Sequence, residues 1–328
     1  MTLAEHLAAQ RSAIPEYASG ASAIIQAIGW VARDIARALA YAAIRGDTGK
    51  TGARNTTGDE QKPLDLWSHD VMAGALRGSR ACSAYVSEEA AEPIEMPEGA
   101  GAHGIVVCCD PVDGSSNLDV GGAVGTIFSL RPAGRRAPAG PAALGPVDNQ
   151  VGAGYVLYGP ATVLVYSMGA GTHGFTLDRE RGEFVLTHPD VSVPKKGKTY
   201  GINEGNIASW HPGQRAFVEH LRTPDKGAGR PYALRYSGAM VADVHRTLLD
   251  GGIFMYPADM SDPAKPKPKL RLLYEVAPMA FLAEQAGGRA STGTERVLEL
   301  TAKEYHQRAA ILIGSAEDVT LAESFYRR

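Results

Sequence analysis

The chain has 328 residues, of which 44% are hydrophobic and 21% charged, and its formal net charge is −3. This balance is typical of a folded globular protein, so it argues against global disorder and against nucleic-acid binding, which usually needs a basic excess. The apolar runs are short and the N-terminus has no basic start, so we expect no membrane span, no secretory signal and a cytoplasmic location.

The first half of the chain predicts two helices followed by a series of strands. Apolar residues recur at three- and four-residue intervals over 19–44, which predicts an amphipathic helix. Residues 45–63 are rich in Gly, Thr and charge and predict a mobile loop, and a second helix is expected to start near Asp65. Strands are then predicted at "ACSAYVSEEA", "GIVVCCD", "GTIFSLRP", "GAGYVLYG", "TVLVYSMG" and "GFTLDRE".

Later segments predict a change of organisation. Residues 131–149 are rich in Pro, Gly and Ala and predict a surface loop. Beyond about residue 190 strand and helix patterns alternate, so we divide the chain into domains at 1–190 and 191–328. Cys108 and Cys109 are adjacent on a predicted strand and therefore point to opposite faces, which favours core residues over a disulfide or a shared metal.

The stretch "CCDPVDGSSNLDV" carries the clearest chemistry. Pro111 restricts the backbone of a proline-containing turn, so Asp110, Asp113 and the Val112 carbonyl can converge on a hard cation such as Mg²⁺. Gly114, Ser115 and Ser116 follow directly and can offer N–H groups and hydroxyls to a phosphate. Metal ligands followed by phosphate donors suit metal-assisted ester hydrolysis. The alternative is a turn whose serines cap a helix.

Other carboxylates strengthen the metal hypothesis. Glu88 and Glu89 end a predicted strand, and Glu275 follows the apolar run "LRLLY", where a carboxylate is costly unless it is paired or bound to metal. Each has a plainer interpretation as an exposed residue. Asp65 before a helix is a common N-cap, and Asp59 in the Gly-rich segment is by default a solvated loop charge.

Taken together, these stretches resemble class I fructose-1,6-bisphosphatases, within the lithium-sensitive metal phosphatase superfamily. The matching segments follow the family's order from about residue 20 to 315: "TGDEQKPLD", "VSEEA", "DPVDGSSNLDV", "GTIFSL", "INEGN", "RYSGAMVADVHRTLLDGGIFMYP", "KLRLLYEVAPMAFLAEQAGG" and "HQRAAILIGS". The resemblance implies a layered α/β/α/β/α fold, a homotetramer, and hydrolysis of the 1-phosphate of fructose 1,6-bisphosphate. It also implies two or more Mg²⁺ ions per subunit, with Mn²⁺ or Zn²⁺ able to substitute.

The resemblance also assigns residue roles. The implied metal ligands are Glu88, Asp110, Asp113, Glu275 and the Val112 carbonyl. Asp65 and Glu89 would polarise the attacking water, and Asp59 would swing in to engage the metal site. The 1-phosphate would contact Asp113, Gly114, Ser115 and Ser116, and the 6-phosphate Asn203, Tyr236, Tyr256 and Lys269, with Arg235 donated to a neighbouring subunit. By contrast, Lys265 and Lys267 are expected to be exposed linker residues.

Three departures from the family pattern matter. Asn206 stands where a tyrosine is usual, so one hydroxyl at the 6-phosphate is missing or supplied differently. Gly104 and Ile105 replace a Lys-Tyr pair that binds AMP, so inhibition of the animal type is not expected. Residues 131–149 hold no cysteine for a chloroplast-type thiol switch. Two alternatives stay open: sedoheptulose-1,7-bisphosphate hydrolysis, alone or in addition, and a non-catalytic sugar-phosphate sensor.

Overall fold

The fold is seen in a computed structural model of the chain. The structure describes residues 1–10, 12–47, 49, 62–99, 101, 103–134, 140 and 144–327. Most of the predicted mobile loop, including Asp59, therefore lies outside the described residues. Within the described ranges, no helix has the length and apolar character needed to cross a membrane.

An eight-stranded sheet forms the N-terminal half. Its strands lie in the order β2-β1-β3-β4-β5-β6-β7-β8, and all neighbours are antiparallel except β1 and β3. The strands are β1 Cys82–Ser87, β2 Ile94–Glu95, β3 Gly104–Asp113, β4 Val124–Gly134, β5 Gly152–Tyr158, β6 Thr162–Ser167, β7 His173–Asp178 and β8 Glu183–His188. Every strand predicted in this half is present, and β2 and β8 were not predicted.

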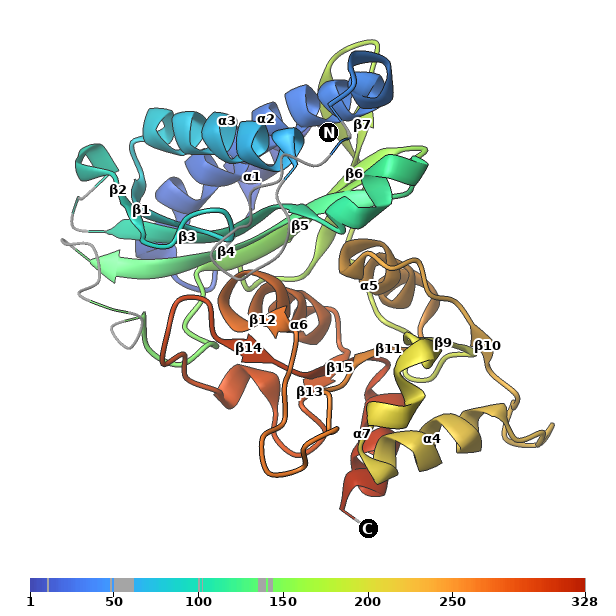
Figure 1. Ribbon diagram of the computed structural model, residues 1–328. Coiled ribbons are helices and arrows are strands. Elements are labelled where there is room, and N and C mark those ends of the chain that lie inside the picture. Colours follow the sequence, from blue (N-terminus) through green and yellow to red (C-terminus); the bar gives the residue numbers. More distant parts are fainter. Residues whose placement is uncertain are drawn as a thin grey trace.

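Helices α1, Leu3–Ala9, α2, Ala18–Arg45, and α3, Pro63–Ser79, cover one face of this sheet (Figure 1). The amphipathic helix predicted over 19–44 is α2, whose apolar residues Ile24, Ile28 and Ile35 are fully buried. Because side chains alternate along a strand, Cys109 joins the core under these helices and Cys108 joins the core on the opposite face. The prediction that the two cysteines point apart is confirmed.

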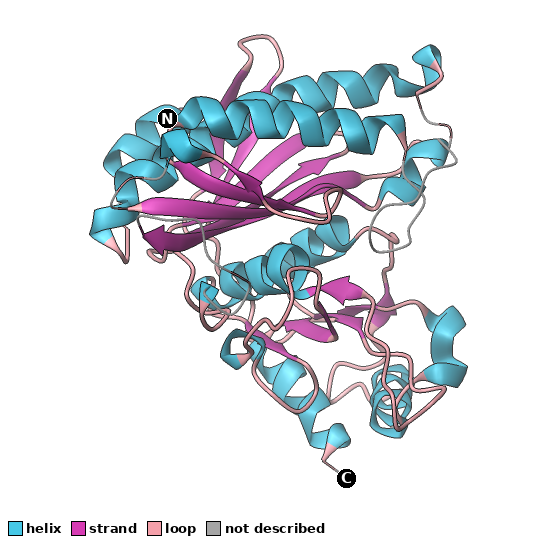
Figure 2. Cartoon of the chain, turned by 60° about the vertical axis from the view of Figure 1, so that its left-hand side comes forward, coloured by secondary structure: helices cyan, strands magenta, loops and turns pink. Residues whose placement is uncertain are grey.

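A smaller, five-stranded sheet forms the C-terminal half, in the order β10-β9-β11-β15-β13. Its strands are β9 Thr199–Gly201, β10 Ala233–Leu234, β11 Ile253–Tyr256, β13 Arg289–Ser291 and β15 Ile311–Gly314. Helices α5, Met240–Asp250, and α6, Ala277–Gln285, lie between the two sheets, and α4, Pro212–Arg222, and α7, Ala316–Tyr326, lie beyond the smaller one (Figures 1 and 2). The predicted α/β/α/β/α layering is confirmed, while the domain boundary near residue 190 stays a prediction.

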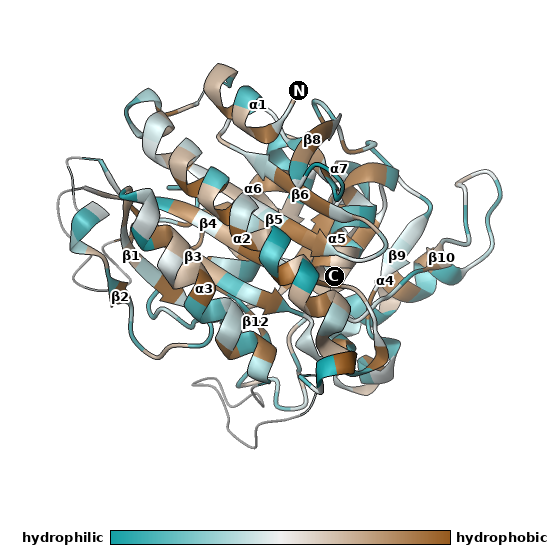
Figure 3. Ribbon diagram, turned by 90° about the horizontal axis from the view of Figure 1, so that it is seen from above, coloured by the Kyte–Doolittle hydropathy of each residue, from teal (hydrophilic) through white to brown (hydrophobic). Residues whose placement is uncertain are grey.

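Three short elements complete the architecture near the site. Strands β12, Leu270–Arg271, and β14, Arg308–Ala309, pair antiparallel, and a π-helical turn, η6 Leu272–Val276, leads into α6. Seen from above, hydrophobic colouring runs along the central strands, and the outlying loops are mostly pale or teal (Figure 3). The apolar segments are thus enclosed between layers, which holds the strand ends in place.

Two predictions about local structure are wrong. Residues Asp110 to Asp113 were expected to form a turn, but they continue β3 to its end. Residues 131–149 were expected to form a surface loop, but β4 extends to Gly134, Leu144 and Val147 belong to the core, and Arg131 is fully buried. The Arg131 guanidinium donates to the carbonyls of three nearby residues: Leu144, Pro146 and Val147. These hydrogen bonds compensate for the burial of its charge.

Candidate active site

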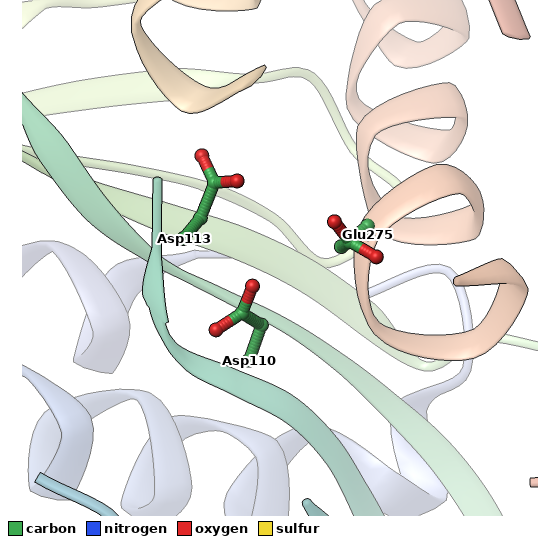
Figure 4. Close-up of side chains that lie close together, drawn as sticks. All are labelled: Asp110, Asp113 and Glu275. Atoms are coloured by element: carbon green, nitrogen blue, oxygen red, sulfur yellow. The ribbon is translucent and has the colours of Figure 1, made fainter. Parts of the chain in front are cut away.

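A buried acidic cluster lies where the two halves of the chain meet. Asp110 and Asp113 project from the end of β3, and Glu275 projects from η6 (Figure 4). One carboxylate oxygen from each of the three lies within 4.8 Å of the others. Residues more than 160 positions apart in the sequence therefore form one oxygen-rich group.

An irregularity in β3 explains why both aspartates face the same side. Side chains three positions apart on a regular strand point to opposite faces. Here Asp110 pairs with Ile127 and Asp113 with Gly125, so three steps on β3 match two on β4. The extra residue is a β-bulge, and it reverses the alternation. A β-bulge, and not the predicted proline turn, therefore brings the two carboxylates to the same side of the sheet.

Gly114 turns the chain from β3 into the short helix η3, Ser115–Val120. Its φ is 76°, a left-handed conformation that L-residues with a Cβ adopt at a cost. A Cβ here would lie 2.6 Å from the Cβ of Ala239. Ser115 is half-buried and Ser116 exposed, so both lie at the surface beside the cluster. The N-terminus of α5 also reaches this point, because the Val241 N–H donates to Asp113 Oδ2 at 2.8 Å.

Arg271 joins two carboxylates from different halves of the chain. Its guanidinium forms an ion pair with Glu88, the residue after β1, and lies 3.9 Å from Glu275 Oε2. Its backbone N–H also donates to that Glu275 oxygen. Arg271 was not predicted to take part in the site, although it lies in the matching segment "KLRLLYEVAPMAFLAEQAGG".

Burial dominates the electrostatics of the cluster. It raises the pKa of Asp110 well above its ordinary value, and the charges of Glu88, Asp113 and Glu275 add to this effect. It raises the pKa of Asp113 to about 7 and that of Glu275 to about 8, despite the hydrogen bond from Val241 to the first and the charge of Arg271 near the second. Carboxylates brought together in this way repel one another unless a cation joins them.

This donor set fits a hard divalent cation. Mg²⁺ and related ions prefer carboxylate and carbonyl oxygens over nitrogen or sulfur. The cluster offers oxygens only, and Cys108 and Cys109 lie in the cores on the two faces of the sheet. One further carboxylate oxygen, Asp65 Oδ1, is buried and accepts no hydrogen bond from any described residue. A bound cation, or a water molecule bound to that cation, would satisfy this unpaired Asp65 oxygen.

The plainer interpretation of Asp65, as the N-cap of α3, is wrong. Lys62 is the N-cap, and Asp65 occupies the third helical position, where its Oδ2 accepts the Lys62 N–H at 2.9 Å. Burial raises the pKa of Asp65 to about 6, opposed by that hydrogen bond, and the charge of Glu88 adds to the rise. Asp65 therefore lies within electrostatic range of Glu88, the carboxylate that Arg271 links to Glu275. Glu89 is half-buried next to Glu88, and its N–H donates to Ser87 Oγ.

The Lys62 ammonium makes a second link that the sequence did not suggest. It lies 2.9 Å from Asp119 Oδ2, in η3. Asp119 had no expected role. The pair ties the start of α3, which carries Asp65, to the short helix that follows Gly114.

A pocket of about 250 Å³ lies in the C-terminal half. The pocket is lined by three of the residues predicted to hold the 6-phosphate, namely Asn203, Tyr256 and Lys269. Asn206, Lys267 and Arg308 line it as well. Lys267 was expected to be a linker residue, and its place in the pocket wall corrects that expectation. Arg308 was missed, although it lies in the matching segment "HQRAAILIGS".

Tyr236, the fourth residue predicted to hold the 6-phosphate, is not among the residues that line this pocket. It is half-buried, and burial raises its pKa to about 12, with contributions from Tyr256, Asp243 and Asp113. Arg235 is exposed and does not line the pocket of its own chain. Its guanidinium donates to the Leu234 carbonyl.

A layered α/β fold with a buried carboxylate cluster and a basic pocket is the arrangement that a metal-dependent phosphoric monoester hydrolase needs, and comparison with known proteins places the chain more closely. The model for the fructose-1,6-bisphosphatase N-terminal domain matches residues 1–189, and that for the C-terminal domain matches residues 193–327. The chain belongs to the class 1 fructose-1,6-bisphosphatase family.

Relatives match over their whole length. A "Fructose-1,6-bisphosphatase class 1" of Oleidesulfovibrio alaskensis is 43% identical, covering 100% of this chain and 98% of its own. A "Fructose-1,6-bisphosphatase, cytosolic" of Oryza sativa subsp. indica is 43% identical over 99% of this chain and 95% of its own. The solved structure of Leishmania major fructose-1,6-bisphosphatase in holo form superposes with a TM-score of 0.90 at 36% identity, covering 100% of this chain and 99% of that one.

Proposed function

We propose that the chain hydrolyses the 1-phosphate of fructose 1,6-bisphosphate to give fructose 6-phosphate and phosphate. One observation carries the proposal: a chain that gathers three buried carboxylates within 4.8 Å of one another also has a pocket lined by Lys267, Lys269 and Arg308. A substrate with two phosphates can then be held at one end and react at the other. Binding energy from the remote phosphate fixes the reacting end in line.

We propose Mg²⁺ as the ion, with two or more per subunit and with Mn²⁺ or Zn²⁺ able to substitute. Glu88, Asp110, Asp113 and Glu275, with the Val112 carbonyl, would hold it. When bound, such ions neutralise phosphoryl oxygens and lower the pKa of coordinated water. The support is the donor set, the 4.8 Å grouping of three carboxylates and the orphaned Asp65 oxygen.

The remaining residues would bind the two phosphates of the substrate and orient and activate the attacking water. Asp65, with a pKa raised to about 6, is poised to accept a proton near neutral pH, and Glu89 would help it orient the attacking water. The N–H groups and hydroxyls that follow Gly114 would receive the 1-phosphate. Asn203, Tyr236, Tyr256 and Lys269 would hold the 6-phosphate. The role of Asp59 stays a prediction outside the described residues.

We further propose a homotetramer in the cytoplasm. Arg235 is exposed and is not among the residues that line the pocket of its own chain, which supports its donation to a neighbouring subunit's site. In support of the location, the rice relative is named cytosolic. Mixing Arg235→Ala chains with Asp113→Asn chains should restore some activity in hybrid assemblies. No recovery after confirmed mixing would exclude a shared site.

The central test measures phosphate release from fructose 1,6-bisphosphate in Mg²⁺ and in EDTA. We expect turnover in Mg²⁺, none in EDTA, and loss in Asp113→Asn, with Asp250→Asn, an exposed carboxylate on α5, as the active control. Tight binding without phosphate release would instead indicate a sugar-phosphate sensor. A parallel assay with sedoheptulose 1,7-bisphosphate shows whether the pocket accepts the longer sugar.

A further inference from the structure

His306 forms a bridge between the two segments that carry the glutamates of the cluster. Its Nδ1 lies 2.8 Å from the hydroxyl of Tyr274, the residue directly before Glu275. Its Nε2 lies 3.1 Å from the carbonyl oxygen of Ala91, in the segment that begins with Glu88. One imidazole therefore touches both halves of the site without contacting a carboxylate oxygen.

The partner sets the direction of one of these hydrogen bonds. A carbonyl oxygen only accepts, so the Nε2–H of His306 donates to Ala91. At Nδ1 the partner is a hydroxyl, which can either donate to the ring or accept from it. The Tyr274 hydroxyl and the Ala91 carbonyl are each hydrogen-bonded to one ring nitrogen of His306, and the two hydrogen bonds together set the orientation of the ring.

The backbone around His306 is itself anchored to η6. The carbonyl of Gln307 accepts the N–H of Leu272 at 2.7 Å, and Arg308 pairs with Arg271 across the β12–β14 ladder. His306 therefore moves with the segment that carries Glu275. Its hydrogen bond to Ala91 is the contact that reaches across to the other segment.

Arg271 spans the same two segments in a different way. It uses the carboxylate oxygens of Glu88 and Glu275, which are the atoms a cation would also need. The His306 bridge leaves those oxygens available. It can therefore hold the separation between the two glutamates both when a cation is bound and when it is not.

We propose that His306, through Tyr274 and Ala91, is a positioning residue that sets the spacing of Glu88 and Glu275 for a divalent cation. The inference rests on the proposed function of the cluster. Groups that orient metal ligands typically alter metal affinity by 10- to 100-fold when they are removed. A bridge that acts through neighbouring residues should lie at the lower end of that range.

The chain offers a matched control. Tyr155 in β5 bonds to the Nδ1 of His245 in α5 at 2.7 Å, which is the same kind of tyrosine–histidine pair across two elements. Neither residue adjoins a carboxylate of the cluster in the sequence. Tyr155→Phe therefore removes an equivalent hydrogen bond with no expected effect on metal binding.

The experiment titrates Mn²⁺ into wild-type protein and into Tyr274→Phe, His306→Leu, their double variant and Tyr155→Phe, by calorimetry. The same samples are assayed for thermal unfolding and for phosphate release. We expect Tyr274→Phe and His306→Leu each to weaken Mn²⁺ binding about tenfold, and the double variant to bind no more weakly, because one bridge is lost in every case. At saturating metal, kcat should recover, and Tyr155→Phe should bind Mn²⁺ as the wild type does.

The outcomes separate this inference from the proposed function. Unchanged Mn²⁺ affinity in Tyr274→Phe, with a fall in Tm like that of Tyr155→Phe, would make the bridge merely structural while leaving the metal site intact. Should His306→Leu not fold, Tyr274→Phe decides alone, since it removes a single oxygen. A wild-type protein that binds no Mn²⁺ would overturn the proposed function and this inference with it.

Discussion

Replacing Asp113 by asparagine should abolish phosphate release and yet stabilise the metal-free protein. Asp113 is 5% exposed, and burial raises its pKa from 3.8 to about 7. A carboxyl whose pKa is higher in the folded than in the unfolded state favours folding most below the unfolded value. That contribution is lost as the pH rises through the folded value. Without metal, the wild type should therefore lose stability between about pH 4 and pH 8.

The magnitude follows from the same pKa values. At 1.36 kcal/mol for each pKa unit, the rise from 3.8 to about 7 corresponds to an upper limit of about 4 kcal/mol. Asp110 and Glu275 take up protons together with Asp113, so part of this energy is shared with them. We expect the asparagine variant to be about 2 kcal/mol more stable than the wild type in EDTA near pH 8. Asparagine keeps an oxygen that can accept the Val241 N–H.

The assay is urea unfolding in EDTA near pH 5 and pH 8, repeated with saturating Mg²⁺, beside phosphate release. The wild type should gain stability from Mg²⁺ near pH 8 by mass action, and the variant should gain much less. Asp250→Asn, at an exposed position, should behave as the wild type throughout. If the Asp113 variant is the less stable protein in EDTA near pH 8, repulsion among buried carboxylates is not what shapes this site.

Three further predictions follow from single contacts. Gly114→Ala should lower the free energy of unfolding by about 1 to 3 kcal/mol, because φ is 76° there, and unchanged thermal unfolding would contradict the left-handed turn. Arg271→Met should lower the free energy of unfolding by about 3 kcal/mol in EDTA, because it leaves Glu88 buried and unpaired. The loss should be smaller in Mg²⁺, because the ion restores positive charge next to Glu88. An equal loss in both conditions would argue against a site shared by Arg271 and the ion. Lys269→Met should lower kcat/KM about tenfold, through both KM and kcat, because the remote phosphate helps to align the reacting end, whereas Lys265→Met, outside the pocket lining, should change neither; equal effects would remove Lys269 from the pocket.

The main strands and helices could be predicted because their signals are local. The pattern over 19–44 identified α2 to within one residue at each end, since its period is a property of the helix itself. The separation of Cys108 and Cys109 followed from strand alternation alone. By contrast, β2 and β8 were missed, and Arg131 was assigned both to the end of a predicted strand and to the Pro-, Gly- and Ala-rich loop after it. A charged residue rarely lies in a core, so nothing local indicated that Arg131 is fully buried.

Partners distant in the sequence could not be predicted from local patterns. Arg271 and Glu88 are buried together, but neither residue's neighbours indicate the other. The same holds for Lys62 and Asp119, and for His306 between Tyr274 and Ala91. In each case the pairing depends on how layers of the fold pack, and packing is decided by contacts that a window of sequence does not contain.

Residue type and order alone establish which residues carry oxygen ligands and phosphate donors. They also supply Gly114, the residue that can make the left-handed step into η3. That Asp110 and Asp113 face one side is a property of the folded chain, since a β-bulge in β3 depends on pairing with β4. The tertiary structure likewise brought Glu275 within 4.8 Å of them by packing η6 against that strand end. A carboxylate becomes a candidate metal ligand only when other carboxylates lie close to it, and the folding of the chain brings these distant residues together.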